Sequence, residues 1–331
     1  MFTAPFWYSP FKRTDKGESQ MEYKTIEELV NTATEKRVKI SELVLKDQSL
    51  SLEITENECF KKMKKNLDVM LDAIEKGTAP GIQSTSGLTG GDAYKLYKKT
   101  ENGEALCGPL MANAIRMSMA VSELNAAMGK IIATPTAGSC GILPGAIGSL
   151  MKIKNIKKED AVMALFTAGA IGLVIANAAS ISGAEGGCQA ECGSASAMAA
   201  AAIVELCGGT PAMAADACAI AVKSILGLVC DPVAGLVEIP CIKRNASGVT
   251  LAFTAAELAL AGIKSRIPAD EVIQAMKSVG DALPAALRET AEGGLADTPT
   301  GKKLQKQVFG INLQTKEQKS SGCLTCRGCK A

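Results

Sequence analysis

A chain of 331 residues allows about two domains and is long enough to bury a sizeable core without disulfide staples. Its residues are 47% hydrophobic and 21% charged, which indicates a globular protein, and its net charge of +2 excludes a strongly basic nucleic-acid-binding chain or an acidic disordered one. The sequence contains no histidine, which excludes an imidazole base, a Ser/His/Asp or Cys/His triad and a histidine metal ligand within this chain.

The twelve cysteines are too few for a disulfide scaffold, and no stretch of the sequence is typical of a signal peptide. We therefore predict a cytoplasmic protein whose cysteines are reduced thiols or metal ligands. Any chemistry in this chain must use cysteine, carboxylate, lysine, hydroxyl or backbone groups.

Residues 1–20 differ in composition from the rest of the chain. Five of the twelve aromatic residues lie in the first eleven positions, and a polar run follows them before Met21. We interpret residues 1–20 as an appended or upstream-start extension and exclude them from the fold prediction.

Two capping boxes predict helices in the next sixty residues. Thr25 stands three residues before Glu28, and Thr55 stands three residues before Glu58. Apolar residues at helical spacing follow the second box as far as Gly77, which predicts the end of that helix. No alternation typical of a strand appears before residue 80.

The middle of the chain is rich in alanine. Residues 161–230 contain 21 alanines and five charged residues, which predicts buried helices whose axes approach closely. Residues 161–184 carry no charge and could span a bilayer by length. Asn177 and two serines dilute that signal and no aromatic belt brackets it, so we predict a central buried helix, with a membrane-spanning helix as the alternative.

An amphipathic pattern returns near the C-terminus, with Pro268 at a predicted helix start and a domain end near Gly310. We predict an all-α fold, with one mostly helical catalytic domain over 21–310 and a flexible tail over 311–331. The tail holds Cys323, Cys326 and Cys329, the beginning of a ferredoxin-type run that lacks its fourth cysteine. The role of these three residues stays open.

Two glycine-rich loops offer backbone N–H groups and hydroxyls that suit a carboxylate or phosphate. The loop STSGLTGGDAYK contributes Ser84, Ser86 and Gly87, and the loop ATPTAGSCGILPG contributes Thr136 and Ser139. The alternatives are an ordinary connection between helices for the first loop and glycines that only permit close helix packing for the second.

Three cysteines lie beside glycine or proline near predicted helix ends: Cys188 in EGGCQAEC, Cys230 in LVCDPVAG and Cys241 in EIPCIKRN. Their spacing matches neither a ferredoxin nor a zinc ribbon. The pattern therefore leaves open a metal site or buried free thiols. The interpretation as buried free thiols suits Cys207 and Cys218 better than it suits these three cysteines.

From about residue 84 to residue 310 the chain resembles the alpha chain of the iron–sulfur-dependent bacterial L-serine dehydratases, also called L-serine ammonia-lyases. The resemblance rests on five strings in the same order, SGLTGGDAYK, NAAMGKIIATPTAGSCGILPGA, GAEGGCQAECGSASAMAAAA, LVCDPVAGLVEIPCIKRNA and PTGKKLQKQVFG. It implies a [4Fe-4S] cluster held by Cys188, Cys230 and Cys241, whereas Cys192 does not match a ligand position. It also implies a second domain or a separate beta subunit, which this sequence lacks.

The resemblance implies dehydration and deamination of L-serine to pyruvate and ammonia, with an open iron as Lewis acid for the leaving hydroxyl. No lysine stands in a convincing Schiff-base context, so we expect no pyridoxal phosphate. Ser84, Ser86 and Gly87 are our candidates for binding the substrate carboxylate, and Thr136 and Ser139 for lining the same pocket.

The general base is not identified by the sequence. Glu185 and Asp231 flank predicted ligand cysteines and are candidates, although support of the ligands or helix capping would explain them equally. We favour a group on the beta subunit.

Other functions stay open at this stage. They are a related iron–sulfur lyase that releases sulfide from L-cysteine, a non-catalytic metal-binding protein and a small membrane protein. The preference among serine, cysteine and threonine is not decided by the sequence.

Overall fold

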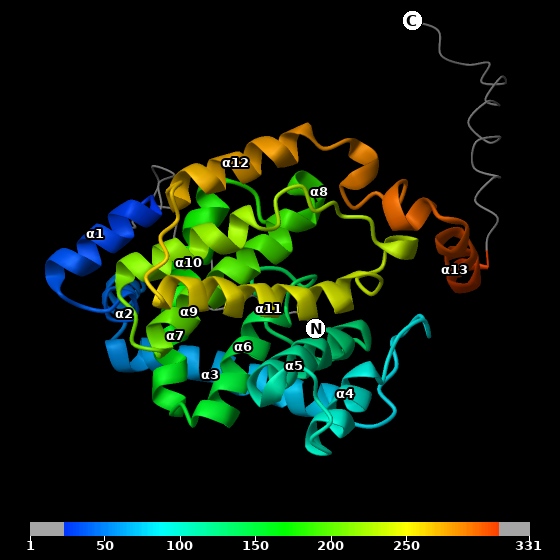
Figure 1. Cartoon of the computed structure of the whole chain (residues 1–331), viewed down its shortest axis with the longest axis horizontal. Helices are drawn as coiled ribbons and strands as arrows, with labels where there is room; N and C mark the ends of the chain where they lie inside the picture. The colour runs from blue at the N-terminus through cyan, green and yellow to red at the C-terminus, as the bar shows by residue number, and fades with distance from the viewer. Residues whose placement is uncertain (1–22, 311–331) are drawn as a thin grey trace, which may run out of the picture.

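The computed structural model describes residues 23–310, which form thirteen α-helices and no β-strand within that range (Figure 1). The predicted all-α fold is therefore confirmed. The extension over 1–20 and the tail over 311–331, with its three cysteines, lie outside the described residues.

The two helices predicted from capping boxes begin where those boxes place them. In α1 (Ile26–Lys36) the Thr25 hydroxyl accepts from the backbone N–H of Glu28 at 3.0 Å, and α3 (Glu56–Gly77) has the full capping box at Thr55. Between them lies α2 (Ile40–Ser51). Helix α3 ends at Gly77 as predicted, and a Cβ at that glycine would clash with the backbone of α5 (Gly108–Ala126).

Helix α9 (Ser194–Leu206) lies at the centre of the molecule and is buried along almost its whole length. It packs against four other helices: α6 (Ile142–Lys154), α7 (Lys158–Ala178), α10 (Pro211–Lys223) and α11 (Cys241–Leu260). The predicted buried, alanine-rich centre is confirmed, because Ala195, Ala197 and the alanines from 199 to 202 are inaccessible to solvent. Small side chains at these positions let the neighbouring helices approach closely.

Helix α7 is long and apolar enough to cross a membrane by length and composition alone. However, 72% of its most apolar window is buried inside the structure, where it packs against α2, α3 and α9. The prediction of a central buried helix agrees with this packing, since a core helix passes the same test.

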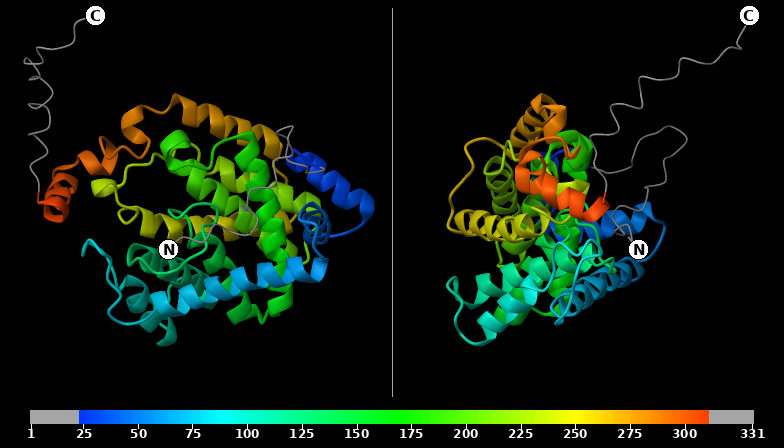
Figure 2. Two further views of the ribbon diagram at one scale, coloured as in Figure 1. Left: turned by 180° about the vertical axis from the view of Figure 1, so that it is seen from behind. Right: turned by 90° about the vertical axis from the view of Figure 1, so that its right-hand side faces the viewer.

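The other helices cover this centre from two sides. Helix α12 (Ala269–Ala282) crosses one end of the molecule, and α3, α4 (Asp92–Glu101) and α5 lie at the opposite end (Figure 2). The short α8 (Gly183–Gly186) packs against α12, and α13 (Pro299–Phe309) completes the described chain. Between α12 and α13 the chain returns past Cys230, which forms an isolated bridge with Arg288.

Candidate active site

The three predicted ligand cysteines come from three different elements. Cys188 immediately precedes a π-helical turn (Gln189–Gly193) that leads into α9, Cys230 lies in the loop after α10, and Cys241 is the first residue of α11. Their exposed fractions are 2%, 3% and 7%, and none forms a disulfide. A π-helical turn inside a helical segment is frequent at functional sites.

The sulfur atoms of Cys188 and Cys192 lie 3.4 Å apart. The hydrogen bond with Cys192 lowers the pKa of Cys188 despite the opposing effect of burial, and the nearby Arg244 guanidinium acts in the same direction as that bond. The same hydrogen bond and burial raise the pKa of Cys192. Of this pair, Cys188 therefore ionises more readily than Cys192.

Cys230 and Cys241 are close enough to Cys188 to be affected by its charge. Burial raises the pKa of Cys230, with further contributions from Glu191 and Cys188, and burial followed by the Cys188 charge raises the pKa of Cys241. As thiolates the three sulfurs would repel one another in a buried space, and a positively charged iron group would relieve that repulsion.

Within residues 23–310 no group of three or more cysteine and carboxylate side chains is arranged to hold a single metal ion. The donor chemistry fits a group of several irons better, because such a group accepts thiolates that lie further apart. The ligand assignment of Cys188, Cys230 and Cys241 stays a prediction.

Glu191 lies in the π-helical turn and connects the cysteines to the second glycine-rich loop. Its Oε1 accepts from the Thr136 hydroxyl at 2.7 Å, and the Ser139 hydroxyl lies 3.2 Å from that of Thr136. Its Oε2 lies 4.0 Å from Cys230 Sγ. Burial raises the pKa of Glu191 to about 7 against the opposing Thr136 hydrogen bond, and the charge of Glu289 acts with burial.

Asn245 fastens the same loop to the helix that carries Cys241. This side chain is fully buried, and its Nδ2 donates to the carbonyls of Gly138 and Cys241 at 2.7 and 2.9 Å. Its Oδ1 accepts from the backbone N–H of Gly141 at 2.8 Å. All polar atoms of the amide are used, so the position of the loop follows that of α11.

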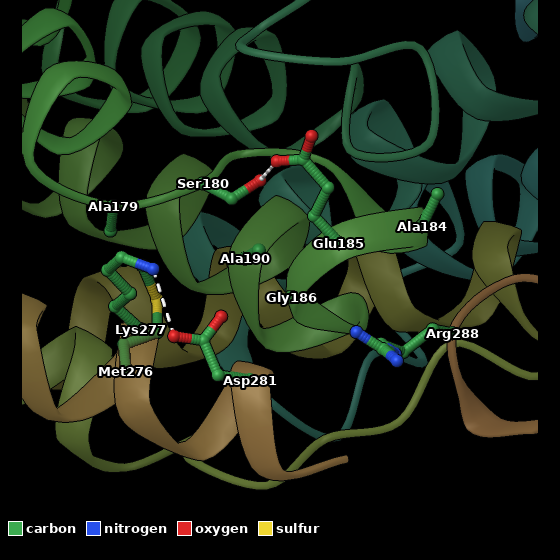
Figure 3. A pocket seen from close by; sticks show the side chains of 10 residues that line it. All are labelled: Ala179, Ser180, Ala184, Glu185, Gly186, Ala190, Met276, Lys277, Asp281 and Arg288. Carbon is green, nitrogen blue, oxygen red and sulfur yellow. Dashed lines mark hydrogen bonds and ion pairs between the residues drawn. The ribbon is translucent and has the colours of Figure 1, made fainter. Parts of the chain in front are cut away.

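The two candidate bases have other partners. Asp231 forms an ion pair with Arg244 at 2.8 Å and accepts from the backbone N–H of Leu295 at 2.8 Å, so its carboxylate holds Arg244 in place. Glu185 is exposed and accepts from the Ser180 hydroxyl at 2.6 Å. Figure 3 shows Glu185 at the rim of a cavity that α8 and α12 share with Arg288.

The first glycine-rich loop closes on itself. The Ser84 and Ser86 hydroxyls lie 3.1 Å apart and accept from the backbone N–H groups of Thr89 and Leu88. The Thr89 hydroxyl donates to Glu238 at 2.6 Å, which ties this loop to the segment between Cys230 and Cys241. The structure thus brings Thr136 and Ser139 to the cysteines through Glu191. Within residues 23–310, Ser84, Ser86 and Gly87 make no hydrogen bond to the cysteine site.

Sequence reasoning missed Glu191, Arg244 and Asn245. Two of them carried a usable signal, because Glu191 follows Cys188 by three positions and Arg244 follows Cys241 by three. Residues three apart lie on one face of a helical turn, so a cysteine at a helix start predicts a neighbour at that spacing.

Comparisons with known proteins agree with this arrangement of residues. The family described as "Serine dehydratase alpha chain" matches residues 35–296, which include all three cysteines. The chain is 52% identical to the probable L-serine dehydratase alpha chain of Bacillus subtilis, over 90% of this chain and 99% of that protein. It is 44% identical to the L-serine dehydratase alpha chain of Peptoniphilus asaccharolyticus, over 86% of this chain and 98% of the other. It is also 38% identical to the L-serine dehydratase of Streptomyces coelicolor, over 83% of this chain and only 60% of that protein.

Proposed function

The chain belongs to the serine dehydratase alpha-chain family, and from this membership and the cysteine site we propose that it converts L-serine to pyruvate and ammonia. The observation that supports the proposal is that the matched segment contains three buried cysteines without disulfide bonds, and that, after burial itself, the Cys188 charge and the Glu191 charge both raise the pKa values of Cys230 and Cys241.

We propose that Cys188, Cys230 and Cys241 hold a [4Fe-4S] cluster. Their burial, their mutual charge effects and the absence of histidine from the whole sequence support thiolate ligation of iron. When bound, such a cluster with three protein ligands supplies a Lewis acid that stabilises negative charge on a leaving hydroxyl.

The residues of the chain itself would orient the substrate and exclude water. Thr136 and Ser139 present hydroxyls next to Glu191, and their loop is fixed by Asn245, so their positions are set before the substrate arrives. In the reaction the Cα–H and Cβ–O bonds of L-serine break, and the hydroxyl leaves as water. The resulting aminoacrylate becomes an imine, which water hydrolyses to pyruvate and ammonia.

A beta subunit would complete this site. The relatives in Bacillus and Peptoniphilus are called alpha chains, which implies a beta-chain partner, and the Streptomyces relative extends well beyond the part that this chain matches. Because the chain has no histidine, we propose that the partner supplies the base that removes the Cα proton. We also propose that the complex works in the cytoplasm, where thiols stay reduced.

The experiment is anaerobic reconstitution of the chain with iron, sulfide and its beta chain, followed by measurement of pyruvate from L-serine. The expected result is serine turnover that requires iron. Cys230→Ser should lose iron and activity, whereas Cys218→Ser, at a thiol buried elsewhere in the core, should keep both. Sulfide release from L-cysteine without pyruvate from L-serine would contradict the proposal.

A further inference from the structure

A cavity of about 350 Å³ lies between α8 and α12, beside the segment that leads to Cys188 (Figure 3). A volume of this size is enough for a small organic molecule. No cysteine is among the described residues that line it, so the cavity is separate from the cysteine site. Four charged residues do line it: Glu185, Lys277, Asp281 and Arg288.

Arg288 is the charged residue of this cavity whose side chain has no partner within residues 23–310. Its Nε is buried and donates no hydrogen bond there, and the guanidinium forms no ion pair with those residues. Lys277, in contrast, pairs with Asp281 at 2.9 Å, and Glu185 accepts from the Ser180 hydroxyl at 2.6 Å. A buried N–H without an acceptor is unfavourable, so this atom lacks a partner that a ligand can provide.

The fold uses the backbone of Arg288 but not its side chain. The Arg288 N–H donates to the Ala285 carbonyl at 3.1 Å, and its backbone forms the isolated bridge with Cys230. The next side chain, Glu289, lies toward the cysteines, because its Oε2 is 3.2 Å from the position that a Cβ on Gly183 would take beside Cys230 Sγ. Two neighbouring side chains thus serve different places, Glu289 the cysteine site and Arg288 the cavity.

The chemistry of the cavity suits a carboxylate. A guanidinium presents a planar fork of N–H donors that matches the two oxygens of a carboxylate. Figure 3 shows the Arg288 side chain on the opposite side of the cavity from Lys277 and Asp281, which neutralise each other. The charges left in the cavity are therefore one cation, Arg288, and one anion, Glu185, which form no ion pair with each other.

We propose that this cavity is a ligand site for a small carboxylate, which the guanidinium of Arg288 binds. The carboxylate can belong to an amino acid such as L-serine or to a keto acid such as pyruvate. We expect the amino acid to bind more tightly, because the negative charge of Glu185 attracts an ammonium group. The site goes beyond the proposed function, since binding here requires neither iron nor turnover.

The test is calorimetry of the iron-free full chain with L-serine, pyruvate and ethanolamine. Ethanolamine keeps the ammonium and hydroxyl groups of L-serine and lacks the carboxylate, so it should bind at least about tenfold more weakly than L-serine. Arg288→Gln should weaken the binding of L-serine and of pyruvate by about 10- to 100-fold, because the charge-assisted hydrogen bonds are lost. Arg288→Lys keeps the charge without the fork and should lie between the two.

The matched control is Arg266→Gln, which removes the same charge from an exposed arginine that does not line the cavity and should leave every dissociation constant unchanged. Arg288→Gln should unfold at the same urea concentration as the unmodified chain or at a higher one, because its side chain makes no bond that the fold needs. A loss of binding in this variant then reports the site and not the stability of the chain.

Two further variants locate the ligand and identify its source. Thr136→Val changes the second glycine-rich loop and should leave L-serine binding to the cavity within about twofold. Glu185→Gln should remove the preference for L-serine over pyruvate, whereas tighter binding of pyruvate by the unmodified chain would identify the keto acid as the ligand. Carboxylate binding that survives Arg288→Gln, or that only Thr136→Val abolishes, would overturn the proposal. Failure of both carboxylates to bind at millimolar concentration would overturn it as well.

Discussion

Gly183 has no side chain, and the groups around it occupy the volume where one would lie. An alanine there would place its Cβ against Cys230 Sγ and Glu191 Oε2, at 2.8 and 2.9 Å. The N–H and the carbonyl of Cys230 both form hydrogen bonds with the segment 287–289, so its backbone is held in place. The side chains around it must therefore shift. We expect Gly183→Ala to lower the turnover of the reconstituted complex by about 100-fold, the effect of moving reacting groups by roughly 1 Å.

The control for this change is Ala184→Ser, an exposed neighbour in the same short helix. It should retain the turnover and the iron content of the unmodified complex. Equal activity of Gly183→Ala and Ala184→Ser would show that the space beside Cys230 is not needed.

Thiol reactivity offers a second test at the scale of single residues. Burial raises the pKa of Cys140 and of Cys218 to about 12, so at pH 8 roughly one molecule in 10,000 carries the reactive thiolate at either position. Cys107 is exposed. We expect iodoacetamide to label Cys107 in the native protein and to leave Cys140 and Cys218 unlabelled, as measured by peptide mass spectrometry.

Denatured protein is the control, because unfolding exposes every thiol to the reagent. Labelling of Cys140 and Cys218 as fast as Cys107 in the native state would contradict their burial. If Cys188, Cys230 and Cys241 are ligands, iron should further lower whatever slow labelling these buried thiols show in the iron-free protein.

Among the elements, the junction between the second glycine-rich loop and α11 depends on Asn245. Asn245→Ala removes three hydrogen bonds and leaves the Gly141 N–H and the Gly138 carbonyl without that partner in a buried place. We expect the free energy of unfolding of the iron-free chain to fall by about 2–4 kcal/mol, measured by urea denaturation.

Ser247→Ala is the matched control on the same helix, since its exposed hydroxyl makes only a 3.4 Å contact within α11. Its free energy of unfolding should stay within about 0.5 kcal/mol of the unmodified chain. If Asn245→Ala unfolded at the same urea concentration as Ser247→Ala, the loop would be held by other contacts.

Elements defined by local sequence were predictable, and those defined by packing were not. Thr25 and Thr55 cap helices because the chemistry that starts a helix lies within four residues. The alanine-rich centre followed from composition, because a helix that is apolar on all sides needs protein or lipid around it. Gly77 ends α3 where it was predicted, although its close contact with α5 could not be seen in the sequence.

The candidate site was predictable only in part for the same reason. Thr136 and Ser139 were identified from their glycine-rich loop, and the structure connects them to the cysteines through Glu191. Glu289 gave no signal, because it lies 59 positions beyond Cys230 and reaches it only through backbone pairing between two distant segments. Contacts of this kind depend on tertiary packing, which overrides local propensity.

At the scale of the whole molecule, the site gathers residues from the start of α9, the start of α11, the loop after α10 and the return segment before α13. No short fragment contains all of them. The helices that pack around α9 hold it in place, and with it the π-helical turn that carries Glu191.

The chain supplies thiols, carboxylates and hydroxyls to this site but no imidazole, and the two acids next to the cysteines in sequence, Glu185 and Asp231, are already engaged by Ser180 and Arg244. We therefore expect the iron-loaded chain alone to show the absorption and the iron content of a cluster while forming pyruvate from L-serine at least about 100-fold more slowly than the complex with its beta chain. A factor of this size is what one positioned acid or base contributes to proton transfer.

Titrating the beta chain into a fixed amount of the anaerobic chain should raise the rate to a plateau at a fixed stoichiometry, while a Cys241→Ser chain should give no rise at any ratio. Full turnover by the chain alone would place the missing base within this sequence and would make Glu191 the first residue to examine, since it is the buried carboxylate that lies within 4.0 Å of Cys230.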